Sequence, residues 1–454
     1  MVYLTRCLRA SSSARTQRDD IESGDYMKIA IIGLGYVGLP LCIQFAKSGA
    51  EVVGIDIDNS KVEAINRGES FIKHISSADI ALLVESKRLT ATTEMAEAKS
   101  CEGILICVPT PLNKNREPDL SFVFSTGEKL APHIGDGSTI VLESTTYPGT
   151  TDEDLRKLLE EGSGKKAGID FHLAYSPERE DPGNPDSKVE IIPKVVGGYT
   201  EACLGKAREI YSVAIETTIP VSSCRAAEAT KLLENIFRSV NIALVNELKV
   251  IYEKMGIDVW EVIEAAKTKP FGFKAFYPGP GLGGHCIPID PFYLTWKARQ
   301  YGISTRFIEL AGEVNTAMPE YVVQRTMEGL NEHRKAVNGA KILIVGLAYK
   351  EDVDDDRESP SYRLLDKFQE RLAEVDYYDP YVPTIKPSRE YSHWSGKQSV
   401  DWQKEVIAGF DAVVISTAHK AVNYNELAEW GQLIVDTRGV MSKHGELGKN
   451  VYQA

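Results

Sequence analysis

Short apolar runs, separated by polar or glycine-bearing turns, dominate the chain after residue 26. Most of the runs are rich in β-branched residues, which is typical of strands buried on both faces of a parallel sheet. The runs lie at residues 28–32, 51–55, 103–108, 138–142, 171–175, 341–345, 373–378, 411–416 and 433–435. Helical or loop segments alternate with them, so the pattern predicts an α/β protein with two doubly wound sheets.

One long segment between the two sets of runs has a helical period. Its apolar residues are Ala226, Ala229, Leu232, Leu233, Ile236, Val240, Leu244, Leu248 and Ile251. Gly256 follows the last of them and can end the helix. The sequence therefore predicts a long central helix over residues 222–256. A helix that joins two α/β units is a common place for subunits to pair, so we expect a homodimer.

These patterns predict four parts of the chain. The parts are an N-terminal extension (1–26), a first α/β domain (27–221), a central helical segment (222–337) and a second α/β domain (338–454). The extension combines arginines and serines and has no acidic residue before Asp19, a composition similar to a weak transit peptide. A disordered tail explains the same composition. So does a start codon that lies upstream of the natural start codon at Met27. We favour these two interpretations.

Composition and charge exclude several classes of protein. A net charge of −13 and a pI near 5.3 argue against binding to a nucleic-acid backbone. No apolar run reaches the roughly 18 residues that are needed to span a bilayer, so membrane insertion is not expected. The seven cysteines are an odd number without paired spacing, which favours a reducing cytoplasm.

A glycine-rich turn follows the first predicted strand. Gly33, Gly35 and Gly38 lie between that strand and a helical segment, where they would let a pyrophosphate approach the helix N-terminus. Asp56 follows the next strand and can accept hydrogen bonds from the adenosine ribose hydroxyls. Asp56 and Asp58 would repel a 2′-phosphate. The sequence therefore predicts a Rossmann-like first domain that binds NAD rather than NADP.

Polar residues follow three later strands of this domain. Ligands of doubly wound sheets gather beyond the carboxyl ends of the strands, which would place Thr110, residues 143–145 and residues 176–178 near the cofactor. Taken singly, each position is equally consistent with an ordinary turn.

The second α/β domain has only the first glycine of such a fingerprint, Gly346, so a second dinucleotide is not expected there. Lys350, Arg357 and Arg438 lie in or after its strand-end loops, where they could neutralise a nucleotide diphosphate. For each residue taken alone, a basic side chain on the surface of an acidic protein is the alternative.

Cys286 lies in the glycine-rich stretch 277–290. A thiol beside a nicotinamide cofactor indicates an alcohol that is oxidised past the aldehyde, because a thiolate can hold the aldehyde covalently for a second hydride transfer. The alternative, a small buried apolar residue, is disfavoured because the glycines before Cys286 would expose it to a ligand.

Lys231 and Asn235 are four residues apart on the predicted long helix and so share a face. They could stabilise an oxyanion with one charged and one neutral donor. From the helix alone, a solvated face explains the pair better.

Together and in this order, these motifs resemble the UDP-glucose/GDP-mannose dehydrogenase family. The motifs are residues 33–40, 108–111 and 144–145, Lys231 with Asn235, and 283–286 with Asp290. The resemblance covers about residues 27–440. Residues 176–183 and 279–281 resemble the bacterial UDP-N-acetylhexosamine branch, and the proline-bearing loop before the cysteine differs from the UDP-glucose pattern.

The resemblance implies a two-step, four-electron oxidation of the sugar C6 hydroxyl to a carboxylate, with two NAD and one water per sugar. Cys286 would form a thiohemiacetal and then a thioester. Lys231 and Asn235 would stabilise the oxyanion, and Asp290 would act with Lys231 and an ordered water as general base.

The resemblance also implies further contacts for the water and for each ligand. Thr145 and Glu178 would hold the water and assist thioester hydrolysis. The implied cofactor contacts are Gly33, Gly35, Tyr36, Val37, Gly38, Asp56, Thr110, Thr145 and Arg357. The implied contacts with the UDP sugar are Lys231, Asn235, Tyr277, Gly279, Gly281, Gly283, Lys350 and Arg438. No metal ion is implied.

UDP-N-acetylglucosamine is the implied substrate, for the synthesis of a surface polysaccharide. The same chemistry on UDP-N-acetylmannosamine, UDP-N-acetylgalactosamine or UDP-glucose stays open, because epimers differ in the direction of one group and are distinguished by pocket geometry. A noncatalytic nucleotide-binding protein of the same fold is the more distant alternative. The presence of Cys286, Lys231 and Asp290 argues against it.

Overall fold

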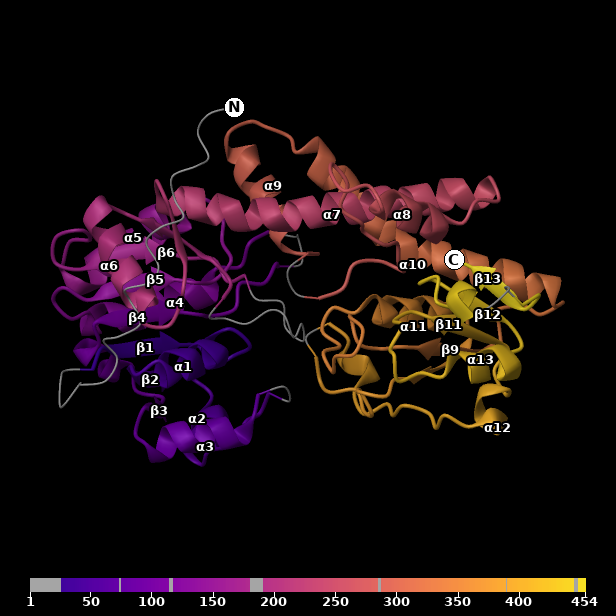
Figure 1. Ribbon diagram of the computed structural model, residues 1–454, viewed down its shortest axis with the longest axis horizontal. Coiled ribbons are helices and arrows are strands. Elements are labelled where there is room, and N and C mark those ends of the chain that lie inside the picture. Colours follow the sequence, from indigo (N-terminus) through magenta and orange to yellow (C-terminus); the bar gives the residue numbers. More distant parts are fainter. Residues whose placement is uncertain are drawn as a thin grey trace.

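Two α/β lobes lie side by side in the computed structural model, which describes residues 26–72, 75–113, 117–179, 191–284, 287–388, 390–444 and 448–454 (Figure 1). Each lobe is built on its own sheet. The long helix α7 (Cys224–Lys254) runs across both lobes and packs against α10 (Arg306–Glu332). The predicted fold class, α/β with two Rossmann-like lobes joined by a long central helix, is confirmed.

The first lobe contains a sheet with strand order β3-β2-β1-β4-β5-β6-β7-β8. Its strands are β1 Lys28–Ile32, β2 Glu51–Ile55, β3 Leu89–Thr92, β4 Gly103–Ile106, β5 Thr139–Leu142, β6 His172–Tyr175, β7 Lys194–Gly198 and β8 Thr218–Val221. Neighbouring strands are parallel except for β6 and β7, which are antiparallel. The start of β7 therefore lies at the edge of the sheet where β6 ends.

Helices cover both faces of this sheet. They are α1 Gly38–Lys47, α2 Asn59–Asn66, α3 Ser77–Glu85, α4 Ser121–Leu130, α5 Arg156–Ser163 and α6 Glu201–Ser212, with short turns η1 Met95–Ser100, η2 Ala131–His133 and η3 Thr150–Leu155. Along β1, Ile29 and Ile31 enter one apolar cluster, while Ala30 and Ile32 enter another. Burial on both faces explains why the strand is continuously apolar.

The second lobe contains a parallel sheet with strand order β10-β9-β11-β12-β13. Its strands are β9 Lys341–Val345, β10 Glu374–Tyr378, β11 Ala412–Ile415, β12 Ile434–Asp436 and β13 Val451–Gln453. Its helices and turns are α11 Pro360–Glu370, α12 Lys404–Ile407, α13 Tyr424–Trp430, η4 Ser392–Trp394 and η5 Met441–His444. The segment between the lobes contains α7, α8 Val259–Lys267, α9 Asp290–Gln300 and α10.

Local signals set the two ends of α7. The Ser223 hydroxyl accepts a hydrogen bond from the Ala226 N–H at 3.2 Å, so the helix begins at Cys224. Gly256 adopts a φ of +69° just beyond its last turn. The long helix predicted over residues 222–256 is confirmed, two residues shorter at each end. The four-part division of the chain stays a prediction.

The sequence patterns miss four strands, namely β3, β7, β8 and β13. β3, β8 and β13 have four, four and three residues, β7 ends in two glycines, and β8 contains Pro220. Proline lacks the N–H that a central strand donates, and β8 tolerates it because it lies at the edge of the sheet. Pairing with neighbours, rather than local preference, makes these segments strands.

The first turn after the first strand is built in the same way in both lobes. In the first lobe the Leu34 N–H donates to Asp56 at 2.8 Å, and in the second the Leu347 N–H donates to Asp379 at 2.6 Å. The glycine before each leucine has a positive φ, 96° in the first lobe and 87° in the second. The two lobes therefore share one turn geometry although only the first has the full glycine fingerprint.

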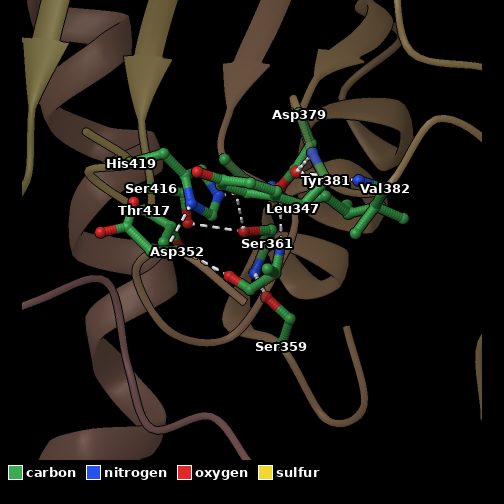
Figure 2. A network of polar contacts seen from close by, with 12 residues as sticks. Leu347, Asp352, Ser359, Ser361, Asp379, Tyr381, Val382, Ser416, Thr417 and His419 are labelled. Atoms are coloured by element: carbon green, nitrogen blue, oxygen red, sulfur yellow. Dashed lines mark hydrogen bonds and ion pairs between the residues drawn. The ribbon is translucent and has the colours of Figure 1, made fainter. Parts of the chain in front are cut away.

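In the second lobe this carboxylate is fully engaged by the protein (Figure 2). His419 Nε2 lies 3.0 Å from Asp379 Oδ2, and two backbone N–H groups donate to Oδ1 at 2.8 and 3.0 Å. His419 Nδ1 accepts from the Asp352 N–H at 3.0 Å, so the ring holds the far end of the same loop. Asp379 thus fixes the loop that carries Lys350 rather than offering its oxygens to a ribose.

Among the described residues, no helix is long and apolar enough to cross a membrane. The described cysteines are all buried free thiols, at positions 42, 101, 107, 203 and 224. Cys286 and its neighbour His285 lie outside the described residues.

Candidate active site

The glycine fingerprint forms a cradle that tolerates no side chain at two of its positions. A Cβ on Gly33 would lie 2.5 Å from the Cys107 carbonyl oxygen, and a Cβ on Gly38 would lie 1.9 Å from the Gly33 carbonyl oxygen. Helix α1 begins at Gly38, and its N-cap residue Val37 makes no side-chain capping bond. The helix N-terminus can therefore donate its N–H groups to a pyrophosphate, and the cradle fits a dinucleotide.

Alanine substitutions at Gly38 and Gly35 should separate folding from cofactor binding. Gly38→Ala is expected to lower the free energy of unfolding by roughly 3 kcal/mol, because its Cβ would overlap backbone that cannot move aside. A Cβ on Gly35 meets no atom within 4 Å, so Gly35→Ala should fold normally and weaken only NAD binding. Urea denaturation and NAD titration of both variants check this. Equal stability of the two variants would contradict it.

Asp56 is buried directly after β2, and its contact with a ribose stays a prediction. Its Oδ2 accepts from the Leu34 N–H at 2.8 Å and pairs with Lys61 at 3.2 Å, while Oδ1 accepts from the Asp58 N–H at 2.9 Å. A carboxylate offers about four acceptor sites, so one remains at Oδ1 for a ribose hydroxyl. The sequence patterns missed Lys61, which lies on α2 five residues after Asp56.

Arg357 of the second lobe reaches the fingerprint of the first. Its guanidinium carbon lies 4.1 Å from the ring centroid of Tyr36, a cation–π contact, and it pairs with Asp355 at 2.6 Å. The structure thus brings together Tyr36 and Arg357, two predicted cofactor contacts from different lobes, and their contact with a cofactor stays a prediction.

Lys231, Asn235 and Asp290 form a buried cluster on α7 and the start of α9. Asn235 Nδ2 donates to Asp290 Oδ2, and Arg238 donates to Asn235 Oδ1. Lys231 Nζ donates to the backbone carbonyl of Glu178. These contacts exclude the solvated-face interpretation for Lys231 and Asn235.

Burial raises the pKa of Asp290 to about 7, against the opposing effects of Lys231, Asn235 and Arg238. A carboxyl group with this pKa can both take up and release a proton near neutral pH. The cluster can therefore supply a general base from α9, together with an ammonium group and an amide donor one turn apart on α7.

The turn that follows β5 carries Thr145, a half-buried residue, and is fixed to α7 by Glu228. Glu228 accepts from the Gly149 N–H at 2.7 Å and from the Thr151 N–H and hydroxyl at 2.9 and 2.7 Å. It lies three residues before Lys231, so it sets the position of this turn relative to the cluster. The sequence patterns missed Glu228, since only the fold brings it to the turn.

Thr110 is buried at the end of β4, where its carbonyl accepts a hydrogen bond from the Tyr293 hydroxyl at 2.8 Å. Tyr293 lies on α9, one turn beyond Asp290. This bond ties the helix that carries the candidate base to the cofactor-binding lobe.

The loop that leads to Cys286 lies against the second lobe. A Cβ on Gly283 would lie 2.9 Å from the Tyr349 Cβ, and one on Gly284 would lie 3.0 Å from the Tyr349 ring. Gly281 has a φ of +136° and faces Pro360 at the start of α11. The glycines therefore let the loop pack closely beside Tyr349, the residue before Lys350.

Arg438 contacts the start of the same loop. A Cβ on Gly279 would lie 2.5 Å from its Nη1, and its Nε donates to the Ser416 carbonyl at 2.6 Å. Tyr277 is turned to α8 instead, where its hydroxyl donates to Glu264 at 2.6 Å. Arg438 thus lies beside the predicted substrate loop.

A cavity of about 1050 Å³ lies between the lobes. Residues from all three parts of the chain line it, among them Tyr36, Pro109, Ser239, Ile289, Arg357 and Tyr381. Ser239 is one turn from Asn235 and Ile289 precedes Asp290, so the buried cluster lies directly beside the cavity. The predicted site residues Tyr36, Gly281 and Arg357 line it, whereas Lys231, Asn235, Asp290, Lys350, Arg438 and Tyr277 do not. Among the described residues, no group of three His, Cys, Asp or Glu side chains could hold a metal ion.

The chain matches one family along most of its length. The NAD binding domain of the UDP-glucose/GDP-mannose dehydrogenase family matches residues 27–215, its central domain matches 225–317, and its UDP binding domain matches 343–443. The UDP-N-acetyl-D-glucosamine 6-dehydrogenase of Pseudomonas aeruginosa is 34% identical over 92% of this chain and 98% of its own length.

Two further comparisons concern Pyrococcus horikoshii. Its UDP-N-acetyl-D-mannosamine dehydrogenase is 34% identical over 92% of this chain and 96% of its own length. A solved structure of the UDP-D-ManNAc dehydrogenase from this organism covers 94% of this chain and 99% of its own, with a TM-score of 0.84 and 33% identity. The chain therefore belongs to the UDP-glucose/GDP-mannose dehydrogenase family, as a nucleotide-sugar oxidoreductase whose cofactor is NAD.

Proposed function

We propose that this protein oxidises the C6 hydroxyl of a UDP-N-acetylhexosamine to a carboxylate, with UDP-N-acetylglucosamine as substrate. The observation that carries this proposal is the buried cluster of Lys231, Asn235 and Asp290 beside the inter-lobe cavity. The relatives from P. aeruginosa and P. horikoshii are named as dehydrogenases of UDP-N-acetylglucosamine and UDP-N-acetylmannosamine, which supports the substrate class. The uronate would serve surface polysaccharide synthesis.

The first oxidation needs a base for the C6 hydroxyl. Asp290, whose pKa burial raises to about 7, takes that proton directly or through a water shared with Lys231. Lys231 and the Asn235 amide donate to the developing alkoxide and stabilise its charge in a site from which bulk water is excluded. The glycine cradle would hold NAD, which would supply a hydride acceptor, with one NAD molecule consumed in each of the two oxidations.

The second oxidation follows once a nucleophile has added to the aldehyde, because the tetrahedral adduct can release the hydride on C6 as its hydroxyl oxygen forms the new C=O bond. We assign the nucleophile to Cys286, whose thiolate adds to C6 to give a thiohemiacetal. Loss of a hydride converts it to a thioester. Water then adds to C6, the C6–S bond breaks, and the electron pair returns to sulfur as the carboxylate is released. Glu178 and Thr145 would hold that water.

The assignment of UDP-N-acetylglucosamine as substrate, rather than an epimer of it, rests on two loops. Residues 176–183 and 279–281 have the form expected for the N-acetylhexosamine branch, and Gly279 and Gly281 of the second loop lie against Arg438 and Pro360. UDP-N-acetylmannosamine, UDP-N-acetylgalactosamine and UDP-glucose are the competing substrates. A noncatalytic nucleotide-binding protein would gain nothing from burying Lys231 and Asp290, since burying ionisable groups is costly.

Counting NADH tests the proposal. A limiting amount of UDP-N-acetylglucosamine with excess NAD should yield two NADH and one uronate per sugar, faster than the three competing sugars do. Faster double oxidation of another sugar would reassign the substrate. One NADH per sugar would remove Cys286 from the mechanism, and none with any of the sugars would favour the noncatalytic alternative.

We also propose a homodimer that pairs along α7. Leu233, Phe237, Leu244 and Ile251 are between 44% and 67% exposed and recur at spacings of four and seven on one side of the helix. Exposed apolar side chains in such a stripe are typical of a subunit interface. Light scattering should give twice the chain mass of 50.1 kDa.

The buried free thiols fit a reducing compartment, and we propose the cytoplasm.

A further inference from the structure

Glu178 belongs to a buried ionic cluster whose other members have no part in the proposed mechanism. Lys194 Nζ lies 2.6 Å from Glu143 Oε2 and 3.7 Å from Glu178 Oε2. The side chains of Lys194, Glu143 and Glu178 are 7%, 0% and 14% exposed. The Tyr211 hydroxyl donates to the other oxygen of Glu143 at 2.5 Å. One ammonium group therefore bridges two carboxylates below the surface.

Strand direction brings these residues together. Glu143 follows β5 and Glu178 follows β6, so both lie beyond the carboxyl ends of neighbouring parallel strands. Strand β7 is antiparallel to β6, with Tyr175 opposite Gly197. Continuing that register by three residues places Lys194, the first residue of β7, opposite Glu178. In a fully parallel sheet the start of β7 would lie at the other edge.

The contacts of Glu178 show what Lys194 holds. The backbone carbonyl of Glu178 accepts a hydrogen bond from Lys231, and its Oε1 accepts from the Arg179 N–H at 2.7 Å. Lys194 is the ammonium group at Oε2. Glu178 therefore lies between two lysines, with Lys231 at its backbone and Lys194 at its carboxylate.

Glu143 and Tyr211 fix Lys194 in place. Burial opposes the charge of Lys194, but the two carboxylates raise its pKa, so it stays charged. Burial raises the pKa of Glu143, Lys194 lowers it, and the nearby Glu178 raises it. A buried ion pair of this kind is a poor source of stability, whereas the loss of one partner leaves an uncompensated charge. The energetics of this ion pair therefore favour a role for Lys194 in positioning Glu178 over a role in stabilising the fold.

We propose that Lys194, anchored by Glu143, is a positioning residue that aims the Glu178 carboxylate at the water that hydrolyses the thioester. This inference rests on the proposed function. In the step concerned, the water oxygen bonds to C6 and one water proton passes to Glu178. The C6–S bond breaks with its electron pair on sulfur, and the other proton leaves from the product carboxyl. Lys194 touches none of the reacting atoms.

Step-resolved kinetics of Lys194→Met tests the proposal. The first turnover should still give two NADH per active site at close to the wild-type rate, because neither hydride transfer uses Glu178. Steady-state uronate formation should fall about 10²-fold, the loss that a misplaced catalytic group can cause. The sugar nucleotide should accumulate on the protein as a covalent adduct visible by intact-mass spectrometry. Lys194→Arg should restore hydrolysis, since it keeps the charge.

A double variant guards against misfolding. Lys194→Met combined with Glu143→Leu removes the Lys194–Glu143 ion pair and replaces it with apolar side chains, a change that buried ion pairs tolerate. It should also accumulate the adduct. Equal losses in the first turnover and in hydrolysis, in a folded variant, would overturn the proposal, as would a failure of Lys194→Arg to restore hydrolysis. A wild-type protein that never yields two NADH would instead reject the proposed function.

Discussion

Replacing Cys286 with alanine is expected to abolish uronate formation while NAD and the UDP sugar still bind. The thiolate is needed only for the covalent half of the reaction, and removal of a catalytic nucleophile typically costs many orders of magnitude in rate. The glycines before Cys286 pack against Tyr349 through their own backbone, so the loop should keep its place in the variant. Product analysis with a limiting sugar, together with NAD and sugar titrations, measures both effects.

Cys101→Ala is the matched control for this variant. Cys101 is a buried free thiol just before β4, at the end of the strand opposite to the cofactor. Its alanine variant should form uronate at the wild-type yield. A wild-type yield of uronate from Cys286→Ala would exclude Cys286 as the nucleophile.

Replacing Asp290 with asparagine is expected to lower kcat by about 10²- to 10⁴-fold, the usual contribution of a positioned general base. The pH dependence has a definite sign. Burial raises the pKa of Asp290 to about 7, so the basic carboxylate is present above that pH and lost below it. The wild-type rate should therefore rise through pH 7, and the asparagine variant should lose this rise. Rates measured from pH 5.5 to 9 with saturating substrates check it.

Asp376→Asn provides the control for Asp290→Asn. Asp376 pairs with Lys397 on the second lobe with its side chain 43% exposed, so the variant should keep both the rate and the pH profile. A rise through pH 7 that persists in Asp290→Asn would assign the titration to another group. Glu228 would then be the next candidate, because burial raises its pKa to about 7 as well.

Several parts of the fold are visible in the sequence because their signals are local. The continuous apolar runs predicted β1, β2 and β9 at the residues where they lie. The helical period predicted α7 to within two residues at each end. The strands that were missed, such as β7 with its two terminal glycines, have weak local preferences and exist because a neighbour pairs with them.

The candidate site divides in the same way. Gly33 and Gly38 could be identified from the sequence, since their role is a backbone geometry that only glycine permits. Lys194 and Glu228 could not, and neither could the pairing of Lys194 with Glu143, because Glu143 is 51 residues from Lys194 along the chain and Gly149 is 79 residues from Glu228. Ordinary spacing rules do not reach so far, and a buried lysine or glutamate has no signature in a single sequence.

By itself, the sequence determined the fold class, the NAD cradle, the family and the set of residue types that the chemistry requires. The tertiary structure decided that Lys231 and Asn235 are buried and meet Asp290, that Arg357 crosses to Tyr36, and that Lys194 lies opposite Glu178. The physical reason is the distance along the chain over which each property is determined. Backbone conformation depends on neighbours in the chain, whereas burial, charge pairing and a shifted pKa depend on which distant segments the packed sheets bring together.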